Sequence, residues 1–186
     1  MKTELPKHYL SLLIPSNQVE NRILQMGNRI TRDLTNDNPV VIAIKEGGVT
    51  FDNKISKVLY KNNYKFDRGV LGVSSYGNGT ESNRSPKVTV PLNVDVAGRK
   101  VIVNEDIVDT GETMAFVIDL LIKSGASSVL INTLLWKPSR EIIKVPIYQN
   151  GFEIPDKFVV GEGIDWADNY RTKCGIWVVN MLVATV

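Results

Sequence analysis

Apolar runs typical of buried strands alternate with helical patterns through the middle of the chain. The runs are "PVVIAI", "KFDRGVLGV", "GRKVIVNED" and "SSVLINTLLW". Apolar residues recur at helical spacing from Val19 to Leu34, and further helices are predicted near residues 51–62 and 113–124. Parallel strands need long crossover connections, which helices usually supply. The alternation predicts an α/β fold with a mostly parallel sheet flanked by helices.

Local signals predict where several of these elements begin and end. Asn17 is a candidate N-cap for the first helix, which we expect to end at "NDNP". Gly125 fits the left-handed position that follows a helix. "KVTV" predicts a further strand, and "GIWVVNMLVATV" predicts one or two buried strands. Residues 137–158 contain three prolines and are expected to be irregular.

Composition restricts the class of protein. With 186 residues, no repeat and no linker, we expect one domain over residues 1–186. A net charge of +2 without a long basic block argues against nucleic acid as a partner. The apolar runs are too short to cross a bilayer, and the first residues lack a signal-peptide pattern, so we expect no membrane contact and a cytoplasmic location. The lone Cys174 is interpreted as a core thiol.

The acidic stretch "NEDIVDTGET", residues 104–113, follows one of the predicted strands and leads into a helix. Such junctions bind anions in α/β folds, yet this one holds four acids and no base. A simple Asp-rich turn is one alternative. A calcium loop fails because Val108 stands where an acid or amide is needed, and a P-loop fails because Gly-Glu-Thr replaces Gly-Lys-Ser/Thr.

Another interpretation suits the spacing better. The backbone N–H groups of Thr110 to Thr113 can bind a phosphate at the start of the helix without side-chain charge. The carboxylates can then accept hydrogen bonds from sugar hydroxyls or from the water shell of Mg²⁺. The stretch therefore predicts a site for a sugar phosphate carried with Mg²⁺.

"VIVNEDIVDTGETM" resembles the phosphoribosyl-diphosphate (PRPP) motif of type I phosphoribosyltransferases. The resemblance implies that Glu105 and Asp106 face the ribose hydroxyls and hold Mg²⁺, and that Asp109 also serves in proton transfer at N7 of a base. Many relatives have Lys at the position of Glu112. The residues that would wrap the 5′-phosphate are Asp109, Thr110, Gly111, Glu112 and Thr113.

"LLWKPSR" and "GFEIPDKFVVGEGIDWADNYR" resemble the purine-binding hood of hypoxanthine-guanine phosphoribosyltransferases. The resemblance implies that Lys137 donates to a 6-oxo oxygen and that Phe158 stacks on the base. Val159 and Asp165 would accept hydrogen bonds from the base, and Asp165 would also serve the metal. Glu162 departs from relatives of the animal type, which carry an aromatic residue there.

Two more segments resemble parts of the same family. "VVIAIKEGGVTF" matches a pyrophosphate loop through Lys45, Gly47 and Gly48, with Glu46 as an additional acid, and Arg171 matches a further pyrophosphate contact. "SSYGNGTESNRSPKV" matches a mobile catalytic loop through Ser75 and Tyr76. Closure of that loop would exclude water from the activated sugar.

Together the resemblances imply a type I phosphoribosyltransferase fold, with residues 36–135 as its core and residues 136–186 contributing the hood. They imply transfer of the phosphoribosyl group from PRPP to a purine base, with Mg²⁺ as cofactor and a homodimer or homotetramer as the assembly. Two alternatives stay open. One is a xanthine- or adenine-specific transferase, and the other is a nucleotide-sensing regulator with the same fold.

Overall fold

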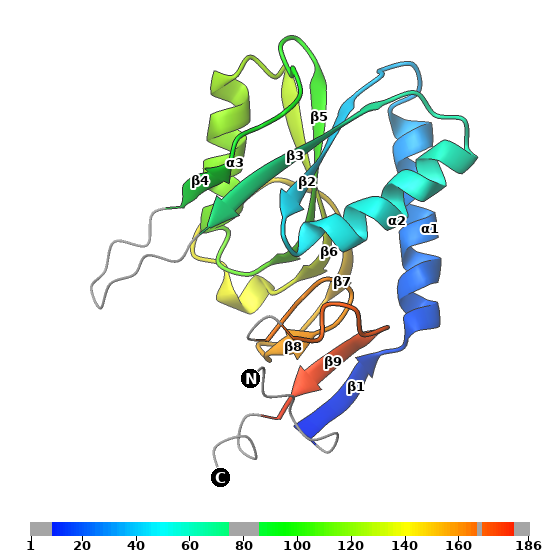
Figure 1. Ribbon diagram of the computed structural model, residues 1–186, viewed down its shortest axis with the longest axis vertical. Helices are drawn as coiled ribbons and strands as arrows, with labels where there is room; N and C mark the ends of the chain where they lie inside the picture. Colours follow the sequence, from blue (N-terminus) through cyan, green and yellow to red (C-terminus); the bar gives the residue numbers. More distant parts are fainter. Residues whose placement is uncertain (1–8, 75–85, 167–168, 181–186) are drawn as a thin grey trace.

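The computed structural model describes residues 9–74, 86–166 and 169–180, which form a large sheet, three α-helices and a small second sheet (Figure 1). The large sheet has the strand order β4-β3-β2-β5-β6-β7. Its strands are β2 (Val40–Lys45), β3 (Asp67–Ser74), β4 (Lys87–Val90), β5 (Lys100–Val108), β6 (Ser128–Trp136) and β7 (Ile147–Glu153). Only the edge strand β4 runs antiparallel to its neighbour, so the prediction of a mostly parallel sheet is confirmed.

Helices cover both faces of this sheet, as predicted. Helices α1 (Ser16–Asp33) and α2 (Gly48–Lys61) lie on one face, and α3 (Glu112–Lys123) lies on the other (Figure 1). Successive β2 side chains alternate between the two cores: Val41 packs with α1 and α2, whereas Ile42 packs with α3. The apolar run of β2 therefore has no polar face because both of its faces are buried.

The small sheet has the order β1-β9-β8 and is antiparallel. It is formed by β1 (Leu10–Ile14), β8 (Val159–Val160) and β9 (Ile176–Val179), and it lies below the large sheet in Figure 1. Its buried side chains, such as Ile176, belong to the same hydrophobic core as those of α1 and β6. A shared core favours the single-domain prediction, although the hood also draws on the amino-terminal strand β1.

Several local predictions were wrong. Residues 137–158 are not all irregular, because β7 fits between Pro146 and Pro155 at the edge of the sheet. Asn17 is not the N-cap of α1. Pro15 takes that position with φ −63° and ψ 147°, and the Asn17 carboxamide oxygen accepts only from the adjacent Gln18 N–H. Cys174 is exposed and is therefore not a core thiol.

Other boundaries moved or held. Helix α2 begins at Gly48, three residues before the predicted start. Strand β5 continues to Val108, two residues beyond the predicted strand, and Glu105 and Asp106 lie on it as predicted. Gly125 has φ 90°, which confirms the left-handed position after α3. Among the described residues, no helix is both long enough and apolar enough to cross a membrane.

Candidate active site

The acidic stretch forms the junction between β5 and α3. The junction follows the carboxyl end of β5, which runs parallel to β2 and β6. Thr113 lies in the first turn of α3. Gly111 connects the two elements with φ 84°. A Cβ atom there would come within 2.0 Å of the Ile143 carbonyl oxygen, so glycine is required by both conformation and space. The predicted strand–loop–helix arrangement is confirmed.

This junction lines a cavity of about 860 Å³. Ten of the predicted site residues contribute to its wall: Lys45, Glu105, Asp106, Asp109, Thr110, Gly111, Thr113, Phe158, Asp165 and Arg171. Lining residues that the sequence did not single out include Ser74, Thr89 and Met114, while Glu46 was noted without a role. Gly47, Gly48, Glu112, Lys137 and Val159 lie behind or beside the wall, and Ser75 and Tyr76 fall outside the described residues.

Glu105 and Asp106 form a buried pair of acids in this wall. They are 7% and 8% exposed, and no ion pair is found for either of them within the described ranges. Burial, and then the adjacent charge of Asp106, raises the pKa of Glu105 well above its ordinary value. The backbone N–H of Ile107 donates to Asp106 Oδ1 at 2.9 Å. The pair is therefore short of positive charge, and a cationic or hydroxyl-bearing ligand would satisfy it.

A buried chain of polar side chains lies directly behind this pair. The Asn132 amide donates to Asn104 Oδ1 at 2.5 Å, and the Asn104 amide donates to Asp52 Oδ1 at 2.7 Å. The guanidinium of Arg68 pairs with the other Asp52 oxygen. All three acceptor-bearing residues are fully buried. The chain fixes β5 between β6 and helix α2, and so it fixes the strand from which Glu105 projects.

Asp109 lies only a few residues further along but has two cationic partners. Arg140 Nε donates to Asp109 Oδ1 at 2.8 Å, and Lys137 Nζ lies 3.4 Å from Asp109 Oδ2. Asp156 is 4.0 Å from the same ammonium and 3.6 Å from the Arg140 guanidinium. Asp109, followed by Asp156, raises the pKa of Arg140. Lys137 is buried, so its ammonium is directed by these carboxylates rather than by solvent.

The backbone of the segment after β6 also supports the loop between β5 and α3. The N–H groups of Ile142 and Ile143 donate to the Thr110 carbonyl at 2.9 and 3.0 Å. The Thr110 hydroxyl donates to the Glu112 carboxylate at 3.1 Å, so that carboxylate is engaged beside the loop and does not line the cavity. The Glu112 N–H donates to Thr110 Oγ1 at 3.5 Å. The N–H groups at the start of a helix point along its axis, and such a junction can bind an anion.

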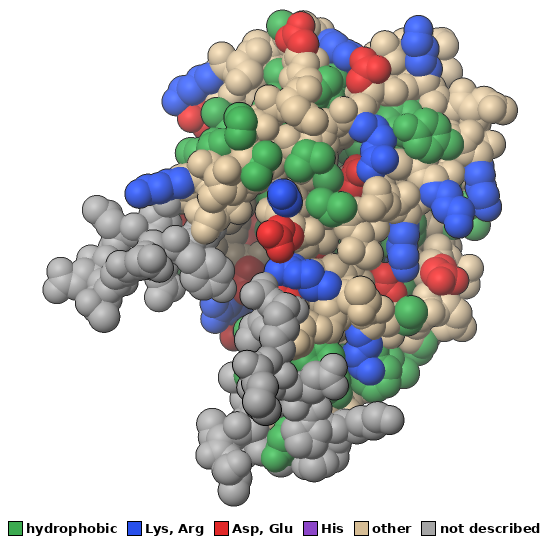
Figure 2. Space-filling view, viewed as in Figure 1, with side chains coloured by type: hydrophobic (Ala, Val, Ile, Leu, Met, Phe, Trp, Pro, Cys, Tyr) green, Lys and Arg blue, Asp and Glu red, His purple; other side chains and the backbone are tan. Residues whose placement is uncertain are grey.

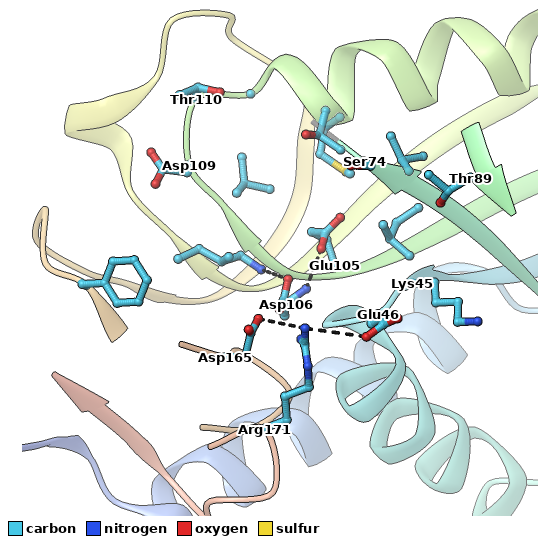
Figure 3. A pocket seen from close by; sticks show the side chains of 18 residues that line it. Lys45, Glu46, Ser74, Thr89, Glu105, Asp106, Asp109, Thr110, Asp165 and Arg171 are labelled. Atoms are coloured by element: carbon cyan, nitrogen blue, oxygen red, sulfur yellow. Dashed lines mark hydrogen bonds and ion pairs between the residues drawn. The ribbon is translucent and has the colours of Figure 1, made fainter. Parts of the chain in front are cut away.

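Arg171 faces the same cavity from the hood. Its Nη2 lies 2.9 Å from Asp165 Oδ1 and 3.7 Å from Glu46 Oε2, and its Nη1 donates to the Gly163 carbonyl at 2.9 Å. Figure 3 shows the guanidinium between the two carboxylates. Because Glu46 is 65% exposed, its contact is the weaker of the two ion pairs.

The loop between β2 and α2 is pressed against the acids. A Cβ atom on Gly47 would come within 1.8 Å of Asp106 Oδ2, and one on Gly48 would come within 2.6 Å of the Asn104 carbonyl oxygen. The Lys45–Glu46 peptide bond is cis. Lys45 is exposed, and Figure 3 shows its side chain extending away from Asp165 and Arg171. Both glycines are thus needed for close packing beside the cavity.

Phe158 and Val159 lie where the hood meets the cavity. Phe158 is 45% exposed and lines the wall, so its aromatic side chain is accessible to a planar ligand. The Val179 N–H donates to the Phe158 carbonyl at 2.8 Å, so the next pair, Val159 with Val178, is a non-hydrogen-bonded pair. The Val159 carbonyl therefore points away from β9, on the open edge of the small sheet.

The residues present suit a magnesium ion that keeps part of its water shell. The carboxylates of Glu105, Asp106 and Asp165 line one cavity, and Mg²⁺ prefers such oxygen ligands. Within the described part of the chain, however, no three acidic, His or Cys side chains are grouped closely enough to hold a metal ion by themselves. Oxygen atoms from a bound ligand would have to complete the coordination.

The surface gives little sign of a polyanion-binding face. In Figure 2, Lys and Arg side chains are dispersed among acidic and apolar ones on the face that is visible. Of the cations in or beside the cavity wall, Lys137, Arg140 and Arg171 are each paired with carboxylates, and Lys45 is exposed. This distribution suits recognition of a small ligand rather than a nucleic acid.

Comparisons with known proteins agree with this geometry. Residues 16–167 match the phosphoribosyl transferase domain family. The hypoxanthine phosphoribosyltransferase of Haemophilus influenzae is 38% identical over 170 residues, which cover 90% of this chain and 93% of that protein. The Escherichia coli enzyme of the same name is 34% identical over 89% of this chain and 92% of its own length.

Solved structures show the same likeness. A hypoxanthine-guanine phosphoribosyltransferase from Bacillus anthracis matches with a TM-score of 0.84 and 32% identity, over 91% of this chain and 98% of that one. A hypoxanthine phosphoribosyltransferase from Staphylococcus aureus matches over the whole of both chains, with a TM-score of 0.89 and 27% identity. The cavity, its acidic strand–loop–helix and its hood are thus those of a type I phosphoribosyltransferase. The chain belongs to the phosphoribosyltransferase family, and relatives that it matches over most of their length are named hypoxanthine phosphoribosyltransferases.

Proposed function

We propose that this protein transfers the 5-phosphoribosyl group from PRPP to hypoxanthine or guanine, giving IMP or GMP and pyrophosphate. The observation that carries the proposal is the pairing of Lys137 with Asp109 beside the β5–α3 junction, with 3.4 Å between Nζ and Oδ2. A donor and an acceptor stand side by side there, next to a loop suited to a sugar phosphate. Such a pair matches the adjacent O6 and N7 positions of a 6-oxopurine.

The pairing selects among purine bases by hydrogen-bond chemistry. An ammonium can only donate, so Lys137 suits the 6-oxo oxygen of hypoxanthine and guanine. The 6-amino group of adenine would leave this buried ammonium without its acceptor, and such mismatches are strongly rejected. Phe158 supplies a stacking surface, and the carbonyl of Val159 with the region of Asp165 can accept from the guanine amine. A 2-oxo group would face acceptors at that position, which ranks xanthine last among the oxopurines.

In the proposed reaction, N9 of the base forms a bond to the anomeric carbon while the bond from that carbon to pyrophosphate breaks. The proton on N7 of the base passes to the Asp109 carboxylate, whose other oxygen is held by Arg140 at 2.8 Å. Positive charge develops on the ribose ring as the leaving group departs. The nearby carboxylates of Glu105 and Asp106 orient the ribose hydroxyls and face this charge.

The anionic ends of PRPP would meet two different kinds of donor. The 5′-phosphate suits the backbone N–H groups from Thr110 to Thr113, supported by the helix dipole of α3. The pyrophosphate suits Arg171, Lys45 and the loop of Gly47 and Gly48. For Lys45, this role requires its exposed side chain to turn toward the cavity. Glu46 opposes pyrophosphate binding, because its carboxylate lies 3.7 Å from the Arg171 guanidinium.

Mg²⁺ bound with PRPP would neutralise charge on the departing pyrophosphate. Glu105, Asp106 and Asp165 are the residues that would hold it, the last by exchanging its contact with Arg171. Because no three such side chains are grouped closely among the residues that the structure describes, we expect weak metal binding until PRPP is present. We also propose a cytoplasmic location. The proposed assembly is a homodimer or homotetramer, and sedimentation analysis would test this oligomeric state.

One assay tests the proposal. Pyrophosphate release would be measured from PRPP and Mg²⁺ with hypoxanthine, guanine, xanthine and adenine in turn. Release with hypoxanthine and guanine is expected, with adenine inactive and all activity lost in excess chelator. No release with any base would refute the proposal, whereas release with adenine alone would refute the role of Lys137. Full activity in chelator would remove Mg²⁺ from the reaction.

A further inference from the structure

Glu162 is a buried acid that takes no part in the cavity wall. Its side chain is 4% exposed, and the residue does not line the cavity. Its carboxylate binds Lys54 Nζ at 2.5 Å through Oε2, while Oε1 accepts from the Gly175 N–H at 2.8 Å. Its own N–H donates to the Lys173 carbonyl at 3.0 Å. The carboxylate and the backbone N–H of Glu162 thus connect this part of the hood to other hood residues and to helix α2.

The backbone around Glu162 is held in an unusual conformation. Gly161, Glu162 and Gly163 have φ values of 104°, 55° and 106°, so three consecutive residues lie in the left-handed half of conformational space. Such a conformation is unfavourable for a glutamate and persists where surrounding contacts determine it. A Cβ atom on Gly161 would come within 2.2 Å of the Gly175 carbonyl oxygen, so the turn is also packed tightly against the hood.

This turn touches the pyrophosphate loop of the core. A Cβ atom on Gly163 would come within 2.3 Å of the Gly47 carbonyl oxygen, and one on Gly47 would come within 1.8 Å of the Asp106 carboxylate. Gly47 is therefore packed between the hood turn and the acid pair. A shift of the turn cannot be absorbed locally, because there is no free space on either side of Gly47.

The same turn contacts the charged side chains of the hood that line the cavity. Arg171 donates to the Gly163 carbonyl at 2.9 Å, and its guanidinium holds Asp165 at 2.9 Å (Figure 3). The Lys54–Glu162 contact thus anchors a segment that positions Arg171 and Asp165 to helix α2. Helix α2 in turn begins at Gly48, beside the loop that faces them.

We infer that Lys54 and Glu162 are positioning residues that set the separation between the hood's Arg171 and Asp165 and the loop of Gly47. The inference rests on the proposed function, in which those groups bind the pyrophosphate part of PRPP. Loss of the pair lets the hood turn move from helix α2, which weakens binding of PRPP. The purine contacts of Lys137 and Phe158 come from other segments, so binding of hypoxanthine, which lacks the 2-amino group assigned to Val159 and Asp165, is spared.

Two single variants and their combination test this inference. Glu162→Gln keeps an acceptor for the Gly175 N–H but loses the charge, and Lys54→Met keeps a long apolar side chain without the ammonium. Each is expected to raise KM for PRPP by ~10–100-fold, as misplacement of a binding group by about 1 Å can do. KM for hypoxanthine and kcat at saturating PRPP should stay within about threefold of wild type. The double variant should be no worse than the poorer single, because both changes break one contact.

A matched control is available on the opposite face of the sheet. Lys123 and Asp119 form an exposed pair at 2.7 Å on α3, so Lys123→Met removes an ammonium without touching the hood. It should leave every kinetic constant unchanged. An unchanged KM for PRPP in both test variants, effects that multiply in the double variant, or a parallel change in the constants for both substrates would overturn the inference. Melting curves identify variants that fail to fold. If Lys54→Met or the double variant fails to fold, the kinetics of the more conservative Glu162→Gln decide the test.

The wild-type protein separates this inference from the function on which it rests. If wild type releases no pyrophosphate with any purine, the proposed function fails and the inference falls with it. If wild type is active and the variants behave like the Lys123→Met control, only the inference is overturned.

Discussion

The two acidic regions of the site lie four residues apart on one segment and are built in opposite ways. Glu105 is buried next to another acid, and burial together with Asp106 raises its pKa. Asp109 is held between Lys137 and Arg140, at 3.4 and 2.8 Å. The first region lacks positive charge until a ligand supplies it, whereas the second is already compensated within the protein. Under the proposed function, this difference means that the protein alone prepares the site for the base, whereas the acid pair is completed only by the sugar and its metal.

Removal of the compensated acid should have the largest effect. Asp109→Asn should lower kcat by ~10²–10⁴, the usual range for one acid–base group, because the amide cannot take the N7 proton. KM for PRPP should change little, since backbone groups supply the phosphate contacts. Steady-state kinetics with both substrates varied would measure this. A variant that retains its turnover would reduce Asp109 to a structural role in the turn.

Removal of its cationic partner should alter base choice. Lys137→Met loses a hydrogen bond to a charged donor, worth about 1.5–3 kcal/mol, which corresponds to a fall of ~10–100-fold in kcat/KM for hypoxanthine. Adenine should not suffer this loss, so the ratio of the two bases should narrow. Arg140 still binds Asp109 in this variant, so the loop should remain in place. An unchanged ranking of the bases would show that Lys137 does not read the 6-position.

Removal of Glu105, the uncompensated acid, should stabilise the ligand-free protein. Glu105→Gln replaces a buried carboxyl group that no described cation balances by a neutral amide, and it should increase the free energy of unfolding of the ligand-free protein by about 1–3 kcal/mol at pH 7. Activity should fall at the same time, because the amide is a poorer partner for ribose hydroxyls and metal. Urea denaturation of both proteins would measure the change in stability. A destabilised variant would show that the Glu105 carboxylate is satisfied in the free protein.

The smallest effect concerns pH. Because the folded-state pKa of Glu105 is raised, the folded protein holds a proton that the unfolded chain releases above about pH 4.5. Wild-type stability should therefore fall as pH rises from that value toward the folded pKa, by at most about 1.4 kcal/mol per pH unit from this one group. In Glu105→Gln this contribution disappears, so the difference between the two proteins should grow with pH and then level off. A constant difference across pH would contradict the raised pKa.

The local parts of this arrangement could be predicted from sequence, because they depend on neighbouring residues. The apolar run before Asn104, the glycine at position 111 and the helical spacing after it place the acids at a strand end. Strand β7 could not be predicted in the same way. Gly151 lies inside it and prolines flank it, and both features count against a strand unless the sheet edge accepts them.

The contacts that distinguish the two acidic regions are not local and were missed. Arg140 is an ordinary exposed-type residue in a proline-containing segment, and only the fold brings it to Asp109 across 31 positions of sequence. Glu162 was noted only as a departure from animal-type relatives, yet its carboxylate turns toward Lys54 rather than toward the base. The family resemblance indicated Lys137 as a purine contact, but its pairing with Asp109 is seen only in the folded structure.

The order of strands in the small sheet has a consequence for how the protein is made. Strand β9, which follows every other described strand along the chain, lies between β1, which precedes them all, and β8. Until Ile176 to Val179 leave the ribosome, neither neighbour has a partner, although β2, β3 and β5 can already associate. Contacts of such long sequence separation form late in folding. A nascent chain should therefore acquire the sugar-phosphate loop well before it can close a hood over a base, and a chain cut short before β9 should never close it.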